Sequence, residues 1–178
     1  MYSRRPKESH LDTVRYEIDM LDFSVQRVVQ QPQARDEGDR NVYLECFLVH
    51  FRNLLRFFSG TNHRKNDLST AEPEHWSPKQ LTEAEIQALQ RPARGLETRY
   101  FDQISAYIQH CTIERHENDI KWDVNGMYRE LDVVIDEFER LFPRDQSVSP
   151  RRKLAQMIAS GIETVRTQAI GWGLEGSR

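Results

Sequence analysis

The chain has 178 residues, of which 38% are hydrophobic and 30% are charged, and its formal net charge is -3. This length is typical of one domain with one sizeable core, and the apolar residues cluster into periodic blocks, which argues against global disorder. The charge balance excludes a molecule-wide positive field that would attract nucleic acid or anionic lipid, so binding of either would have to be local.

Cysteine usage and hydropathy bear on the compartment of the protein. Cys46 and Cys111, the only cysteines, each lie within an apolar helical pattern, where reduced core thiols are typical. Residues 1–10 are basic but precede an amphipathic segment instead of the apolar run of a signal peptide. No apolar run approaches the length needed to span a bilayer. We therefore predict a cytoplasmic protein that does not associate with membranes.

A first helix is predicted over residues 11–30, where apolar residues recur at alternating spacings of three and four. These residues are Leu11, Val14, Ile18, Leu21, Val25 and Val28. Such a narrow seam either packs inside the protein's own bundle or joins two copies of the chain. Residues 1–10 are expected to form a flexible N-terminus.

A second helix is predicted over residues 41–58, with apolar side chains on so much of its circumference that it belongs in the middle of a bundle. Arg52 and Arg56 share one charged stripe of this helix. His50 lies between apolar positions and is expected to be shielded from solvent. Its imidazole is either a general acid or base, or, as is commoner, a core histidine with a hydrogen-bond partner.

Residues 59–80 form a long polar connection, in which Trp76 is expected to pack the loop onto the bundle. Thr82 and Glu85 then have the spacing of a capping box. This pattern predicts a short helix that ends before Pro92, because proline interrupts helical hydrogen bonding.

A long helix is predicted over residues 96–115. Arg115 continues the apolar face of this helix, and His110 lies near its end. Both residues are candidate catalytic groups, and a solvated helix end with a dipole-stabilised arginine is the alternative interpretation.

The last predicted elements are a helix over residues 123–142 and a helix from Ser149 to residue 170, followed by a flexible tail over residues 171–178. No strand-like alternation competes with the helical pattern. The sequence thus predicts an all-α protein, an antiparallel bundle of about five long helices and one short helix, within a single domain over residues 11–170.

Basic residues gather around the start of the last predicted helix, where cations oppose the helix dipole. A bound anion would account for them, with phosphate the obvious candidate, and a tolerated cluster of surface charges is the alternative. The cluster comprises Arg144, Arg151, Arg152 and Lys153.

The long connection also contains His63, Asp67 and His75, residue types that can bind zinc or harder metals. They lack the spacing of any known metal motif, so no metal and no other cofactor is predicted. A metal-dependent hydrolase that acts through this loop is a third functional hypothesis.

Two segments of the sequence resemble known helical proteins. The first is residues 45–54, ECFLVHFRNL, with Phe57-Phe58, and the second is residues 108–115, IQHCTIER, followed by Trp122. Together they resemble a group of small bacterial helical proteins of unknown function, over about residues 41–143. The bundle is also similar in outline to HEPN domains.

The resemblance to HEPN domains implies a dimeric ribonuclease that needs no metal and that pairs an arginine with a histidine a short interval later. Arg56 and His63 have such a spacing here, although Phe57 replaces the polar residue that usually follows the arginine. By this resemblance Arg56 would polarise the substrate, and His63 would be the acid or base that activates a ribose 2′-hydroxyl.

The sequence therefore favours two functions. The first is a non-enzymatic helical interaction or regulatory protein that associates with a protein partner or with itself as a homodimer, through the residue 11–28 seam or an exposed part of the second helix. The second is a HEPN-like, metal-independent endoribonuclease that binds RNA. Its candidate catalytic residues are Arg56 and His63, with His50, Arg52, His110 and Arg115 as second choices.

Overall fold

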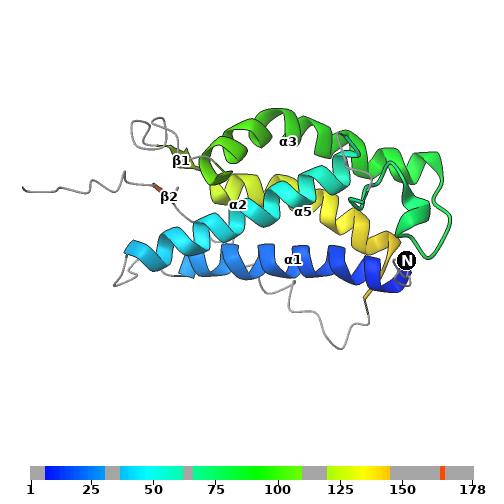
Figure 1. Ribbon diagram of the computed structural model, residues 1–178, viewed down its shortest axis with the longest axis horizontal. Coiled ribbons are helices and arrows are strands. Elements are labelled where there is room, and N and C mark those ends of the chain that lie inside the picture. The colour runs from blue at the N-terminus through cyan, green and yellow to red at the C-terminus, as the bar shows by residue number, and fades with distance from the viewer. Residues whose placement is uncertain (1–6, 31–36, 62–65, 110–119, 145–164, 167–178) are drawn as a thin grey trace, which may run out of the picture.

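The computed structural model is mostly helical, and the all-α class predicted from the sequence is confirmed (Figure 1). The structure describes residues 7–30, 37–61, 66–109, 120–144 and 165–166. Its elements are α1 (Lys7–Gln30), α2 (Glu37–Ser59), the short 3₁₀ helix η1 (Pro73–His75), α3 (Glu83–Gln109), β1 (Lys121–Trp122), α5 (Val124–Leu141) and β2 (Val165–Arg166).

Neighbouring helices run antiparallel, and α5 contacts α1, α2 and α3. The direction follows from side-chain contacts, whose residue numbers rise in one helix as they fall in the next. The contacts are Tyr16 with His50 and Phe23 with Tyr43 between α1 and α2, Phe51 with Tyr100 and Ser59 with Arg94 between α2 and α3, and Arg99 with Glu130 and Tyr107 with Trp122 between α3 and the β1–α5 segment.

The structure corrects the predicted number of helices, because α3 replaces the predicted short helix and the long helix that follows it. Pro92 lies inside α3 and lacks the N–H of a helical hydrogen bond. Leu89, Ala93 and Leu96 around it are buried on the side that faces the core. Packing of this stripe outweighs the local cost of proline, because most helical stability in proteins comes from tertiary burial.

The predicted last helix is also wrong where the structure describes it. Val165 and Arg166 form strand β2, which pairs antiparallel with β1 through Val165 opposite Trp122 and Arg166 opposite Lys121. A β-branched valine and an aromatic tryptophan favour such a pair over a helix. The remaining residues of that predicted helix lie outside the described ranges.

Helix α1 begins at Lys7, within the segment that was expected to be a flexible N-terminus. Glu8 in its first turn suits the helix dipole. His10 ties the same turn to the long connection, since its Nδ1 lies 2.7 Å from the backbone oxygen of His75. A contact across the chain thus extends the helix beyond the start of its apolar seam.

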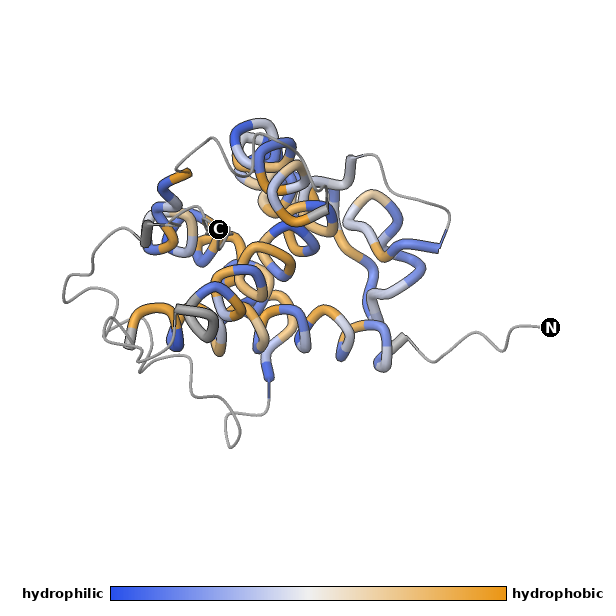
Figure 2. Tube along the Cα trace, turned by 60° about the vertical axis from the view of Figure 1, so that its left-hand side comes forward, coloured by the Kyte–Doolittle hydropathy of each residue, from blue (hydrophilic) through white to orange (hydrophobic). Residues whose placement is uncertain are grey.

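The apolar seam of α1 lies in the protein's own core, where its side chains are 0–5% exposed. It faces the buried side of α2, and Figure 2 shows the apolar positions of the helices turned towards one another. The first of the two interpretations of this seam therefore holds: it packs inside the bundle. The buried side chains of α2 are Leu44, Phe47, Leu48, Phe51, Leu54, Leu55, Phe57 and Phe58.

Trp76 packs the long connection onto the bundle, as predicted. Its ring is fully buried, with centroids 5.0 Å from Phe57, 6.0 Å from Phe138 and 5.3 Å from Phe142. Its Nε1 donates to the backbone oxygen of Ser69 at 2.7 Å, so the polar end of the indole is satisfied as well. The connection is therefore anchored between α2 and α5.

The predicted capping box at the start of α3 is confirmed. The backbone N–H of Thr82 donates to Glu85 Oε2 at 2.8 Å, and the backbone N–H of Glu85 donates to Thr82 Oγ1 at 3.3 Å. The bonds from the Thr82 backbone and hydroxyl hold the pKa of Glu85 below its ordinary value. This cap therefore stabilises the fold above the unfolded pKa of Glu85 and is lost as pH falls through the lowered folded pKa.

Trp76→Ala is expected to lower the free energy of unfolding by about 3–5 kcal/mol, because it empties a buried aromatic site. Chemical denaturation followed by circular dichroism measures this change. Val133→Ala, at an exposed position of α5, is the matched control and should change stability by no more than about 0.5 kcal/mol. Equal effects of the two substitutions would contradict the anchoring role of Trp76.

Candidate functional site

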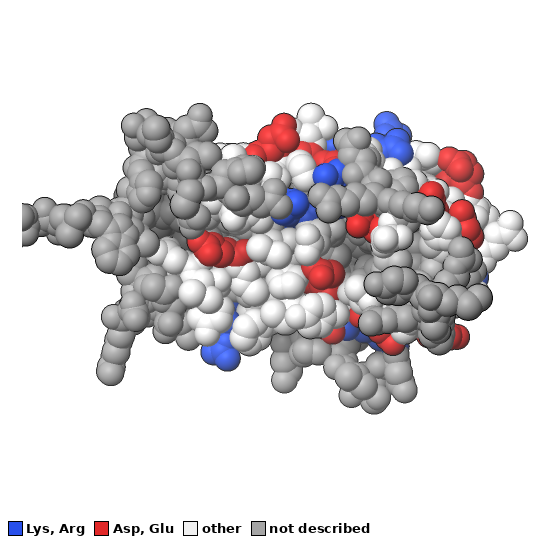
Figure 3. All heavy atoms as spheres, viewed as in Figure 1, with Lys and Arg blue, Asp and Glu red and all other residues white. Residues whose placement is uncertain are grey.

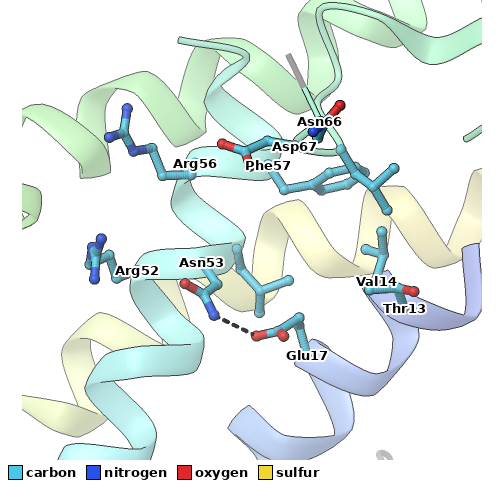
Figure 4. Close-up of a pocket in the computed structure, with 11 residues that line it drawn as sticks. Thr13, Val14, Glu17, Arg52, Asn53, Arg56, Phe57, Asn66 and Asp67 are labelled. Carbon is cyan, nitrogen blue, oxygen red and sulfur yellow. Dashed lines mark hydrogen bonds between the residues drawn. The ribbon is translucent and has the colours of Figure 1, made fainter. Parts of the chain in front are cut away.

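A pocket of about 550 Å³ opens where α1, the C-terminal half of α2 and the connection after α2 meet (Figure 4). This volume lies in the usual range for a small-molecule site. It is lined by Thr13, Val14 and Glu17 from α1, by Arg52, Asn53, Leu54, Arg56 and Phe57 from α2, and by Asn66, Asp67 and Leu68 from the connection.

Two arginines form the α2 edge of this pocket. Arg52 and Arg56 are one helical turn apart, and both guanidinium groups lie over the ring of Phe101 on α3, with Cζ 5.3 Å and 4.4 Å from its centroid. The attraction of each cation to this shared ring holds two like charges side by side. Figure 4 shows the two side chains extending along the same side of α2. The two guanidinium groups are therefore held against α3, and Figure 4 shows their side chains directed away from Glu17.

Two carboxylates face the same space, Glu17 from α1 and Asp67 from the connection. Glu17 is fixed by α2, because its Oε2 lies 2.8 Å from His50 Nδ1 and accepts from Asn53 Nδ2 at 3.1 Å. The side chains of His50 and Glu17 are only 11% and 22% exposed. The ring of Tyr16 meets the imidazole edge to face, with centroids 6.1 Å apart. Glu17 is thus held in one position by two neighbours, His50 and Asn53.

The structure places three of the candidate catalytic residues from the sequence at or next to this pocket. Arg52 and Arg56 line the pocket, and His50 adjoins it through Glu17. The carboxylate partner of His50 fits both of its predicted roles, because a histidine held by a carboxylate occurs in protein cores and also as a general acid or base. The remaining catalytic candidates, His63, His110 and Arg115, lie outside the described residues.

Sequence reasoning missed Glu17 as a member of this site. The one available signal is its position directly before Ile18 of the buried seam, which places it at the flank of the α1 core face. Asp67 was considered only as a metal ligand. The sequence did not predict that either carboxylate lies at the same pocket as the two arginines, because segments that are distant in the sequence meet there.

Arg144, the described member of the predicted anion site, lies between two carboxylates. Its Nη1 is 2.5 Å from Asp19 Oδ1, and its Nε is 3.1 Å from Glu139 Oε1. The pair with Asp19 joins the segment after α5 to α1, and the pair with Glu139 joins the same segment to α5 itself. Arg151, Arg152 and Lys153 lie outside the described ranges, so an anion site that includes them stays a prediction.

Two further properties concern only the part of the chain that the structure describes. No helix there is long and apolar enough to cross a membrane. No group of three or more His, Cys, Asp or Glu side chains there could hold a metal ion. His75, a candidate ligand from the sequence, instead pairs with Glu72 at 3.1 Å.

Comparison of the chain with models of protein families, with curated proteins and with solved structures finds no match. The resemblance to HEPN domains and to small bacterial helical proteins therefore stays a prediction.

A double-mutant cycle on His50 and Glu17 tests whether this pair joins α1 to α2. His50→Ala and Glu17→Ala are each expected to destabilise the fold, with a coupling energy of about 1–2 kcal/mol, because their bond involves a charged group and is shielded from solvent. Denaturation of the four proteins measures the coupling.

The exposed pair Glu137 and Arg140 on α5 is the control for this cycle and should show a weaker coupling. Additive effects of His50→Ala and Glu17→Ala would contradict the structural role of their bond.

Proposed function

We propose that this chain is a helical interaction protein that forms a homodimer through the solvent-facing side of α1 and α2. The observation that carries the proposal is the distribution of exposed large hydrophobic side chains. Among the described residues four of the five lie on this side and are 37–63% exposed, whereas Val133 lies apart on α5. The four, named the α1/α2 face, are Tyr16, Phe23, Val42 and Val49.

Helical spacing makes these residues one surface. Tyr16 and Phe23 are seven residues apart on α1, as are Val42 and Val49 on α2, and such a spacing returns to the same side of a helix after two turns. Phe23 contacts Tyr43, with ring centroids 6.1 Å apart, so the two stripes meet between the helices. Figure 3 shows an uncharged stretch of surface over α1 and α2, bordered by acidic and basic groups.

Charge placement on α1 favours a second copy as the occupant of this face. Asp12 and Arg27 are exposed residues on the same outward stripe of α1 as Tyr16 and Phe23. Asp12 lies one turn before Tyr16, and Arg27 lies one turn after Phe23. The midpoint between Tyr16 and Phe23 is also the midpoint between Asp12 and Arg27. A twofold axis at that point therefore places Tyr16 against Phe23 of the other copy, and Asp12 against its Arg27. Isologous dimers require this self-complementarity.

The proposal differs from the sequence-based hypothesis in the surface that it uses. The residue 11–28 seam is buried in the monomer, whereas Val42 and Val49 are an exposed part of the second helix. A cytoplasmic location remains part of the proposal. It is supported by Cys46, which is a free thiol, because free thiols persist in reducing compartments.

Charge reversal tests the proposed dimer. Asp12→Arg and Arg27→Asp are each expected to weaken dimerisation about tenfold, because each places like charges opposite one another at both symmetric positions. The combined Asp12→Arg/Arg27→Asp protein should recover dimerisation, since it restores opposite charges. Sedimentation equilibrium measures the dissociation constants of the wild type and of the three variants.

Substitution of the aromatic centre supplies the control for this experiment. Phe23→Asp should give a monomer, and Val133→Asp, at a more exposed apolar position on α5, should leave the dimer intact. A monomeric wild type at high concentration would overturn the proposal, and so would the absence of rescue in the combined charge variant.

The second candidate function, a metal-independent endoribonuclease, is favoured by one observation. Arg52 and Arg56 line one pocket beside the carboxylate-bound His50, and such groups suit phosphate neutralisation and proton transfer. Among the described residues, the pocket is lined by two carboxylates as well as two arginines, and this balance disfavours a polyanion. We therefore rank this function below self-association.

Cleavage of total RNA in the presence of a chelator tests the ribonuclease function. It predicts cleavage by the wild type, loss of cleavage in Arg56→Ala, and no change in Arg99→Ala, which removes an exposed arginine outside the pocket. Absence of cleavage by folded wild-type protein would remove this candidate.

A further inference from the structure

We infer that Tyr43 and His50 of α2 join the two copies of the proposed dimer by a reciprocal hydrogen bond. The hydroxyl of Tyr43 in one copy donates to His50 Nε2 in the other, and the twofold axis makes this bond twice. The inference rests on the proposed self-association of the chain, and it names the polar contact that fixes how the two copies align.

The places of these two residues follow from the packing of α1 against α2. The imidazole of His50 meets the ring of Tyr16, and the ring of Tyr43 meets that of Phe23, with centroids 6.1 Å apart in each pair. The two helices run antiparallel and side by side (Figure 1). His50 and Tyr43 therefore lie beside the two aromatic residues at the centre of the α1/α2 face.

The symmetry of the proposed dimer brings the two residues together. The rotation that places Tyr16 against Phe23 of the second copy reverses the direction of α1, so its axis is perpendicular to that helix and lies between the two facing surfaces. Because α2 runs alongside α1, the axis crosses α2 as well. His50 accompanies Tyr16, and Tyr43 accompanies Phe23. The same rotation therefore places His50 against Tyr43 of the second copy.

Residue spacing on α2 agrees with this axis. Tyr43 and His50 are seven residues apart, as are the exposed valines Val42 and Val49. The midpoints of the two pairs differ by one residue, which is a rise of about 1.5 Å along a helix. One axis therefore pairs both the apolar and the polar residues of α2 across the interface.

The imidazole of His50 is oriented for such a bond. Its Nδ1 lies 2.8 Å from Glu17 Oε2. An ionised carboxylate only accepts hydrogen bonds, so Nδ1 carries the proton and Nε2 of the neutral ring is an acceptor. Among the described residues, no donor bonds to this Nε2. A tyrosine hydroxyl of the second copy supplies the donor.

Tyr43 presents a held ring and an unbonded hydroxyl. Its ring is partly buried against the core and contacts Phe23. Its hydroxyl has no hydrogen-bond partner in the part of the chain that the structure describes. An interface over the α1/α2 face removes water from both this hydroxyl and His50 Nε2, and a polar group buried without a partner costs free energy. The bond between them removes both costs at once.

Removal of either partner tests the bond in the dimer. Tyr43→Phe and His50→Asn are each expected to weaken dimerisation about tenfold, because each removes both symmetric hydrogen bonds. Tyr43→Phe keeps the ring that contacts Phe23, and the amide of His50→Asn can still donate to Glu17. Tyr100→Phe, which removes a hydroxyl of α3 that bonds to Glu130, is the matched control and should dimerise as the wild type does. Sedimentation equilibrium measures the dissociation constants, and circular dichroism checks that each variant is folded.

A mixture of the two variants tests whether the bond crosses between copies. Each homodimer lacks both bonds, whereas the heterodimer keeps one, from Tyr43 of the His50→Asn copy to His50 of the Tyr43→Phe copy. After correction for its statistical share, the heterodimer should associate about threefold more tightly than either homodimer. Native mass spectrometry separates the three dimers by mass.

The control mixture contains Tyr100→Phe and His50→Asn. Its heterodimer has one bond, which is the average of the two homodimers, so it should form only in its statistical share. A structural effect within one chain cannot favour the heterodimer of the first mixture, because each chain carries the same substitution in both of its dimers.

Two results would overturn the inference and leave the dimer standing. The first is a wild type that dimerises no more tightly than Tyr43→Phe. The second is that the heterodimer of Tyr43→Phe and His50→Asn forms only in its statistical share. A wild type that is monomeric at high concentration would instead refute the proposed dimer and this bond with it.

Discussion

The burial of Trp76 is the constraint on which the arrangement of the site depends. Its ring fills the space between α2 and α5, and its indole N–H holds the backbone of Ser69. Next to it, the backbone N–H of Thr70 donates to the carbonyl of Phe57 at 3.0 Å. The connection therefore returns along the C-terminal end of α2, which brings Asp67 and Leu68 to the pocket. A buried aromatic contact thus positions a polar edge of the pocket.

Helix α2 connects the fold, the pocket and the proposed dimer surface. Its inner side packs against α1 and α3, its outer side carries Val42 and Val49, and its last turns carry the two pocket arginines. His50 stands between these regions, with Tyr16 of the α1/α2 face on its ring edge and Glu17 of the pocket on its Nδ1. The pocket and the proposed dimer surface therefore lie on the same pair of helices but use different side chains.

Local patterns in the sequence were sufficient to predict the helical class, the core seam of α1, the position of Trp76 and the capping box before α3. They failed where distant packing overrides a local rule, as at Pro92, whose flanking turns are buried in one continuous helix. The helical wheel placed Arg52 and Arg56 together, because both belong to one helix. Glu17 joins them through contacts between residues more than thirty positions apart in the sequence, such as its bond to His50. Periodicity within one segment cannot predict such a contact.

Self-association through the outer side of α1 and α2 is the central claim, and dipolar coupling between spin labels tests it most directly. A nitroxide attached at Met20→Cys, in a chain with Cys46→Ala and Cys111→Ala, would lie between Tyr16 and Phe23, next to the proposed twofold axis. The account predicts strong coupling between the labels of two copies at this position and none for the same label at Val133→Cys. No coupling at Met20→Cys, or equal coupling at both positions, would contradict it.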